Sequence, residues 1–153
     1  MKCLIVGCGY VGLPLGAELV RQGATYFSDE YALIDAEGRA HPYPRPLLLR
    51  NGGSEQAPTL PAELNAKVGG EPAPVGWILS LEYQVGGAWR IEPVPQSLAL
   101  MALLRNTPHT LADSPQIVTW FQKAVASASC FAGRRGDAAE AASHILDIAG
   151  RPS

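Results

Sequence analysis

The stretch CLIVGCGYVGLP, residues 3–14, decides the fold class. Its first four residues form a continuous apolar run that is too short for a helix and stops at Gly7, which favours a buried strand. Residues 13–22 then predict a helix, because Pro14 lies in the first turn, where its missing N–H costs nothing, and Gly23 lies where a helix ends. A strand, a glycine-rich turn and a helix in this order are typical of units that bind a nucleotide phosphate.

The turn has the spacing G-x-G-x-x-G and consists of Gly7, Cys8, Gly9, Tyr10, Val11 and Gly12. In this pattern the first glycine permits a tight turn, the second lets the backbone approach a pyrophosphate, and the third allows close packing of helix and strand. The N–H groups at the start of the helix would face the anion. We therefore predict that these six residues, together with Leu13, bind the cofactor, with a tight turn that binds nothing as the alternative.

Two carboxylates, Asp29 and Glu30, lie between the aromatic and apolar segments 25–27 and 31–34. We interpret this region as a second strand, closed by a turn at residues 35–38 and paired in parallel with the first strand through a right-handed crossover. A dinucleotide-binding unit carries its ribose-binding carboxylate about 20 residues after the glycine turn. Both acidic residues lie close to that position, and a solvated strand end is the alternative for each.

The chain of 153 residues predicts a single nucleotide-binding-like domain over residues 1–150, of the α/β class. Its β-α-β phosphate-binding unit is expected at residues 1–35, in a P-loop-like or Rossmann-like three-layer arrangement. Residues 51–74 are rich in Gly, Pro, Ala and Glu without a sustained period, which predicts a long surface loop.

The second half of the chain predicts a β-hairpin followed by a helical C-terminal third. Two strand candidates within residues 75–94 flank the pair Gly86-Gly87, which is a hairpin signal. Residues 97–150 contain strong helix formers and apolar stripes, with Asp137 as an N-cap and Gly150 as a helix stop. The pair Arg134-Arg135 is expected at a helix entry, either solvated or in contact with a phosphate.

Composition limits the partners. With 47% hydrophobic and 17% charged residues, a net charge of −2 and a pI near 5.9, the chain is expected to fold around a core and not to bind nucleic acid. No apolar run approaches the roughly 18 residues of a membrane span, so we expect a cytoplasmic protein without a membrane partner. No metal spacing connects the cysteines and histidines, which are Cys3, Cys8, Cys130, His41, His109 and His144.

The glycine turn also fits G-x-x-x-x-G followed by Leu13 and Pro14, which is the phosphate loop of a kinase with two residues replaced. In such loops a Lys contacts the β- and γ-phosphates and a Ser or Thr hydroxyl holds Mg²⁺. Leu13 has no ammonium group for the phosphates, and Pro14 has no hydroxyl for Mg²⁺. A kinase built on this loop is therefore expected to be inactive or weak.

Different parts of the chain resemble two different protein families. Residues 1–23, MKCLIVGCGYVGLPLGAELVRQG, resemble the opening of NAD(P)-dependent epimerase/dehydratase proteins of the extended short-chain dehydrogenase group. The chain from residue 24 to 150 resembles the HPr kinase/phosphorylase-like proteins, through ATYFSDEYALIDAEGRAHPYPRPLLLR (24–50), SLEYQVGGAWRIEPVPQSLALMALLRNT (80–107) and GRRGDAAEAA (133–142).

The second resemblance covers most of the chain, and it implies an ATP-binding protein related to P-loop serine kinases. It places Asp29 beside the metal and the attacked hydroxyl, as the catalytic residue, and implies a protein or peptide serine as the substrate. It also assigns the family's lysine position to Leu13 and its hydroxyl position to Pro14. The first resemblance implies NAD(P) instead, although no tyrosine of the chain is followed by a lysine four residues later. A non-catalytic structural or interaction module is the third alternative.

Overall fold

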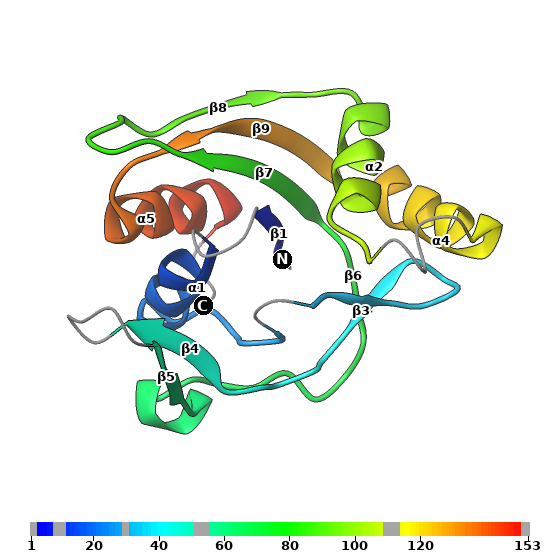
Figure 1. Ribbon diagram of the computed structural model, residues 1–153. Coiled ribbons are helices and arrows are strands. Elements are labelled where there is room, and N and C mark those ends of the chain that lie inside the picture. The colour runs from blue at the N-terminus through cyan, green and yellow to red at the C-terminus, as the bar shows by residue number, and fades with distance from the viewer. Residues whose placement is uncertain (1–2, 8–11, 29–30, 51–55, 109–113, 151–153) are drawn as a thin grey trace.

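The main sheet has four strands in the order β1-β7-β9-β8 (Figure 1). The computed structural model describes residues 3–7, 12–28, 31–50, 56–108 and 114–150. The strands of the main sheet are β1 (Cys3–Gly7), β7 (Trp77–Tyr83), β9 (Ser129–Arg135) and β8 (Arg90–Pro93). β1, β7 and β9 run parallel to one another, and β8 is antiparallel to β9. Pro93 is tolerated in β8 because that strand lies at the edge of the sheet.

Helices cover both faces of this sheet. α1 (Gly12–Arg21) and α5 (Ala138–Ala149) pack on one face, where Leu15 and Ile145 meet Leu79 of β7. α2 (Gln96–Arg105) and α4 (Pro115–Ala126) pack on the other face, against Ile78 of β7. Successive strand residues point to opposite faces, so Ile78 and Leu79 each anchor a different helix layer.

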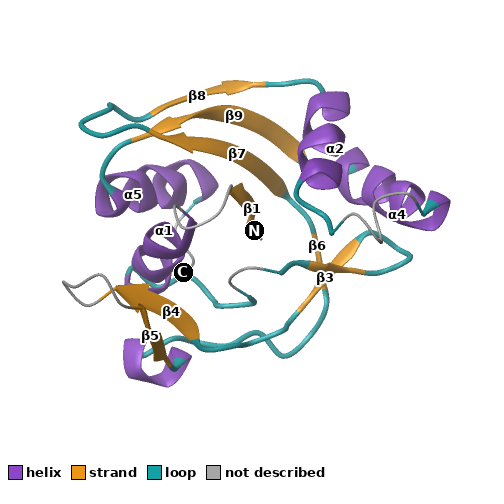
Figure 2. Cartoon of the chain, in the orientation of Figure 1, coloured by secondary structure: helices purple, strands orange, loops and turns teal. Residues whose placement is uncertain are grey.

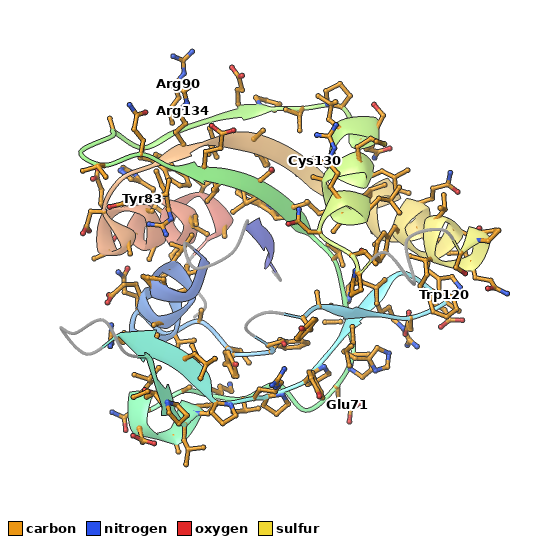
Figure 3. All side chains as sticks on the ribbon, viewed as in Figure 1. Glu71, Tyr83, Arg90, Trp120, Cys130 and Arg134 are labelled. Carbon is orange, nitrogen blue, oxygen red and sulfur yellow. The ribbon has the colours of Figure 1, made fainter. Side chains whose placement is uncertain are left out.

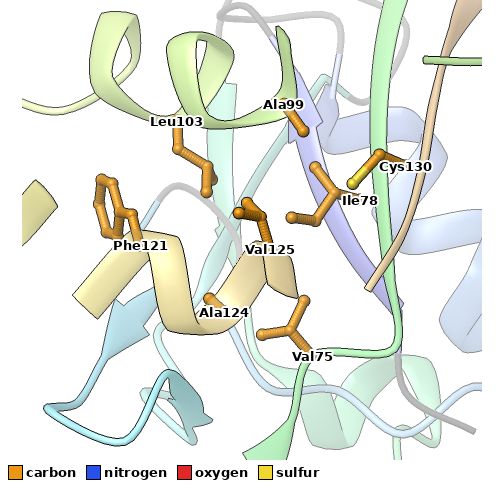
Figure 4. Packing of buried hydrophobic residues seen from close by; sticks show 8 residues of the cluster. All are labelled: Val75, Ile78, Ala99, Leu103, Phe121, Ala124, Val125 and Cys130. Atoms are coloured by element: carbon orange, nitrogen blue, oxygen red, sulfur yellow. The ribbon is translucent and has the colours of Figure 1, made fainter. Parts of the chain in front are cut away.

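The core between the sheet, α2 and α4 is shown in Figure 4, and its buried members are Val75, Ile78, Ala99, Leu103, Phe121, Ala124, Val125 and Cys130. Phe121 and Val125 lie one helical turn apart on α4, as the predicted apolar stripe requires. Burial raises the pKa of the Cys130 thiol, which keeps it protonated and unreactive.

Two small sheets and a 3₁₀ helix complete the fold (Figure 2). β2 (Leu33–Ile34), β3 (Arg39–His41) and β6 (Ala73–Pro74) form one antiparallel sheet. β4 (Leu47–Arg50) pairs with β5 (Gln56–Thr59), and η2 (Pro61–Leu64) follows.

The local helix signals are confirmed. Pro14 lies in the first turn of α1, as predicted, and Leu15, Leu19 and Val20 form a buried apolar stripe on that helix. The Asp137 side chain caps α5 by accepting hydrogen bonds from the backbone N–H groups of two residues of its first turn, at 2.9 and 3.0 Å. Gly150 ends that helix with a φ of 73°, a conformation that glycine adopts without strain.

The predicted second strand of the β-α-β unit is wrong. The turn at residues 35–38 is present, with the Gly38 N–H bonded to the Asp35 carbonyl at 2.9 Å. However, Tyr26 forms an isolated bridge with Val68, and β2 pairs with β3. The described part of residues 25–34 therefore pairs with Val68 and with β3, and the described neighbour of β1 is β7, far along the chain.

The predicted β-hairpin is also wrong, although its turn exists. The Gly87 N–H donates to the Gln84 carbonyl at 2.9 Å, and Gly86 has a φ of 65°. The strands on either side, β7 and β8, do not pair, because β9 lies between them and bonds to both. A glycine turn reverses the chain, but it does not determine which strand fills the adjacent position in the sheet.

Two further expectations are corrected. Residues 51–74 are not a structureless loop, since β5, η2 and β6 lie there. The C-terminal third is not wholly helical, since β9 occupies residues 129–135 between α4 and α5. The α/β content is as predicted, with helices and mixed sheets in the described residues.

The close approach of β8 to β9 depends on Gly133, and we expect Gly133→Ala to destabilise the fold. A Cβ atom at this position would lie 1.9 Å from the Arg90 carbonyl oxygen, so β8 would have to move. Overpacking of this kind costs about 1–3 kcal/mol. Gly16→Ala is the matched control, because a Cβ there meets nothing within 4 Å and Ala is favoured inside a helix by roughly 0.5–1 kcal/mol. Urea unfolding of both variants should show opposite shifts, and equal shifts would contradict the described pairing.

Candidate functional site

The carboxyl ends of three parallel strands meet at one edge of the main sheet. The register aligns Gly7 of β1 with Leu81 of β7, and Leu81 with Gly133 of β9. In α/β sheets ligands bind outside the carboxyl ends of the strands. This carboxyl edge, made by the last residues of β1, β7 and β9, is therefore the candidate site.

Two helices on the same face follow strands that end at this edge. α1 follows β1 and α5 follows β9, and the two helices pack against each other. The first turn of α1 contains no acidic residue, so the partial positive charge of that helix end is not neutralised from within the turn. In α5 the Asp137 carboxylate already occupies the N–H groups of Ala139 and Glu140. The start of α1 is thus the better position for an external anion.

The predicted cofactor-binding residues occupy this edge where they are described. Gly7 is the last residue of β1, Gly12 is the first residue of α1, and Leu13 lies in the first helical turn. The turn that joins strand to helix therefore leaves β1 at the carboxyl edge. The remaining predicted site residues lie outside the described residues, namely Cys8, Gly9, Tyr10, Val11, Asp29 and Glu30.

Sequence reasoning missed Tyr83 and misinterpreted Arg135, which are register partners at the ends of β7 and β9. Alternation along the strands puts both side chains on the face of the sheet that α1 and α5 cover. The Arg135 guanidinium lies 5.2 Å from the centre of the Tyr83 ring. Tyr83, labelled in Figure 3 near the left end of β7, is 50% exposed, whereas Arg135 is only 3% exposed.

The buried Arg135 is fixed by several contacts. Its side chain donates a hydrogen bond to the Gly136 carbonyl at 3.0 Å. Burial lowers the pKa of the Arg135 guanidinium, while the nearby Tyr83 and Asp137 oppose that shift. An arginine remains charged at neutral pH despite such a shift, so the buried Arg135 guanidinium places a fixed positive charge at the carboxyl edge. The expected helix entry for this residue is corrected, because it belongs to β9.

The opposite face of the same edge is open to solvent. Arg134 lies beside Arg90 of β8, as Figure 3 shows, and its Nε is 3.9 Å from a carboxylate oxygen of Glu82. These side chains are exposed, so the ion pair contributes little to stability. Within the described residues no group of three or more His, Cys, Asp and Glu side chains could hold a metal ion.

A second cluster of charged side chains surrounds Asp35, in the turn between β2 and β3. Its carboxylate accepts hydrogen bonds from the backbone N–H groups of Glu37 and Arg39, at 3.0 and 2.8 Å, and from the Arg39 side chain at 2.9 Å. The His41 Nε2 atom lies 2.8 Å from the same carboxylate. Partial burial opposes ionisation, but these hydrogen bonds prevail and hold the pKa of Asp35 well below its ordinary value. The cluster stabilises the turn between β2 and β3.

Comparison with known proteins adds no relative: no family model, no curated protein and no solved structure matches the chain. Among the described helices, none combines the length and the apolar character needed to cross a bilayer.

Because the Asp35 carboxylate binds its proton less tightly in the folded chain than in the unfolded chain, its contribution to stability depends on pH. That contribution is present above the ordinary carboxyl pKa of about 3.9 and declines as the pH falls below it. We expect Asp35→Asn to be less stable than the parent protein at pH 7, with a gap that narrows between about pH 4 and pH 2. Chemical unfolding at several pH values measures the gap. Glu71→Gln, at an exposed position, is the control, and a gap for Asp35→Asn that is constant with pH would contradict the described hydrogen bonds.

Proposed function

We propose that the protein binds a nucleotide such as ATP, in preference to the dinucleotides NAD and NADP, through its phosphates at the carboxyl edge of β1, β7 and β9. The observation that supports this most directly is the position of the glycine turn. It leaves the last residue of a parallel strand, Gly7, and enters the first residue of a helix, Gly12. Strand ends and a helix start then converge on one point, where backbone N–H groups and the helix dipole favour a phosphate.

The strand pairing favours ATP over a dinucleotide. In a dinucleotide-binding unit the strand after the first helix lies next to the first strand and brings a carboxylate to the ribose. Here the described neighbour of β1 is β7, while Tyr26 before the two carboxylates bridges to Val68 and β2 after them pairs with β3. A P-loop-like arrangement, in which β1 has a distant strand as its neighbour, fits these observations better. The resemblance of residues 24–150 to HPr kinase/phosphorylase-like proteins points in the same direction.

The chemistry of the first helical turn argues against efficient phosphoryl transfer. The Leu13 side chain cannot contact the β- and γ-phosphates as an ammonium group does, and Pro14 has no hydroxyl for Mg²⁺. Asp29 alone, in the catalytic position that the resemblance implies, would lack the groups that hold the phosphate and the metal. We therefore propose a divergent HPr kinase-like nucleotide-binding protein with weak or no kinase activity toward a protein or peptide serine.

Calorimetry of the purified chain tests this proposal against its alternatives. We expect ATP to bind weakly, with a Kd on the order of 0.1–1 mM, and with little dependence on Mg²⁺ because the metal-holding hydroxyl is absent. Tighter binding of NAD⁺ or NADP⁺ that is lost in Gly9→Val would favour the dinucleotide alternative. Binding of none of these ligands would favour a structural or interaction module and overturn the proposal.

Restoring the two replaced residues of the phosphate loop should strengthen ATP binding. The double variant Leu13→Lys with Pro14→Ser introduces an ammonium group and a hydroxyl at the start of α1. A charge-assisted hydrogen bond to a phosphate justifies an increase of about tenfold in affinity. Part of this increase in ATP affinity should require Mg²⁺, because the introduced hydroxyl acts through the metal.

The matched control is Leu13→Gln with Pro14→Ser, which adds similar length without the charge. It should bind ATP no better than the parent chain when Mg²⁺ is left out. Equal affinities for the two double variants, or no change in either, would count against a kinase-like frame.

A further inference from the structure

We propose that Tyr83 is the residue on which the base of the nucleotide stacks, with Arg135 holding the ring from behind. This inference rests on the proposed nucleotide binding and names the group that recognises the base. It gives a role to the side chains of Tyr83 and Arg135, which take no part in the proposed phosphate contacts.

The position of Tyr83 follows from the strand register. Gly7 is aligned with Leu81, and Tyr83 lies two residues further along the adjacent strand. With a rise of about 3.3 Å per residue and about 4.8 Å between strands, the two Cα atoms of Gly7 and Tyr83 are roughly 8 Å apart. That is the scale on which a nucleotide extends from its phosphates toward its base. By strand alternation the Tyr83 side chain also lies on the face of the sheet that α1 covers, which is the helix that starts at Gly12.

The ring is both accessible and held. Half of the Tyr83 residue is exposed, whereas Arg135, whose guanidinium lies 5.2 Å from the ring centre, is buried. Gly136 accepts the hydrogen bond of Arg135 and itself packs closely against the Gly87 backbone, where a Cβ would lie 2.1 Å from the Gly87 carbonyl oxygen. A cation held in this way fixes the ring by cation–π attraction, so little freedom is lost when a planar ligand stacks on it.

Stacking on an aromatic ring tolerates any base, because every base has a π-face. The Tyr83 ring offers a stacking surface, which does not by itself read the hydrogen-bonding edge of a base. We therefore expect similar affinities for ATP and GTP.

The test compares ATP, GTP and inorganic triphosphate on the full chain by calorimetry. Tyr83→Leu should weaken ATP and GTP binding about tenfold and leave triphosphate binding unchanged, because only the base is affected. Tyr83→Phe keeps the ring and should retain the parent affinities. Tyr43→Leu, which makes the same change at another exposed tyrosine, is the matched control and should bind all three ligands normally.

The outcomes separate this inference from the proposed function. If the parent chain binds neither ATP nor triphosphate, the proposed nucleotide binding fails. If it binds triphosphate as tightly as ATP, or if Tyr83→Leu leaves ATP binding unchanged, phosphate binding stands and the stacking role of Tyr83 is overturned. If the Tyr83→Leu variant does not fold, the variants Tyr83→Phe and Tyr83→Trp test the stacking role instead. Both keep an aromatic ring and should keep ATP binding. Loss of ATP binding in either variant, with triphosphate binding unchanged, would overturn the assigned geometry.

Discussion

The parallel pairing of β1 with β7, and of β7 with β9, is the constraint on which the candidate site depends. Because the three strands run in the same direction, their carboxyl ends come together at one edge. Gly7, the last residue of β1, therefore lies at the same edge as Tyr83 and Arg135, which are far from it in sequence. An antiparallel partner for β1 would have put the amino end of that partner at the turn and separated these side chains from it.

The two faces of the sheet have different roles. On one face α2 and α4 bury an apolar cluster around Ile78 and the unreactive Cys130, which makes that side a stable support. On the other face α1 and α5 pack together and both start at the carboxyl edge. The capping of α5 by Asp137 neutralises one helix start, so the two helices are not equivalent toward an anion. The proposed phosphate-binding edge therefore combines a packed support on one face with a helix start, that of α1, whose first turn carries no acidic residue.

The parts of the fold that could be predicted from the sequence are those determined by neighbouring residues. Leu15 and Leu19 give the apolar face of α1, and Asp137 with Gly150 gives both ends of α5, because caps and stripes act within a few residues. The position of the glycine turn, between a strand and a helix, followed from the same kind of signal.

The predictions that the structure contradicts depend on contacts between segments that are distant in sequence. The Gly86-Gly87 turn looked like a hairpin because its sequence says nothing of β9, which inserts between β7 and β8. The strand β9 was itself missed, since its small and basic residues between two helices lack a strong β pattern. The segment after α1 has the composition of a strand, but its partners at Val68 and in β3 could not be inferred locally. For the same reason Tyr83 and Arg135 did not appear together as site residues.

The most direct measurement of the central claim is an amide chemical-shift map of the isotope-labelled chain during titration with ATP. The account predicts that the shifted signals belong to the carboxyl edge, with Gly7, Gly12 and Tyr83 among them, while Trp77 and Ser129 at the opposite ends of the strands stay unchanged. Shifts gathered at the amino ends of these strands or on the small sheets, or no shifts at saturating ATP, would contradict it.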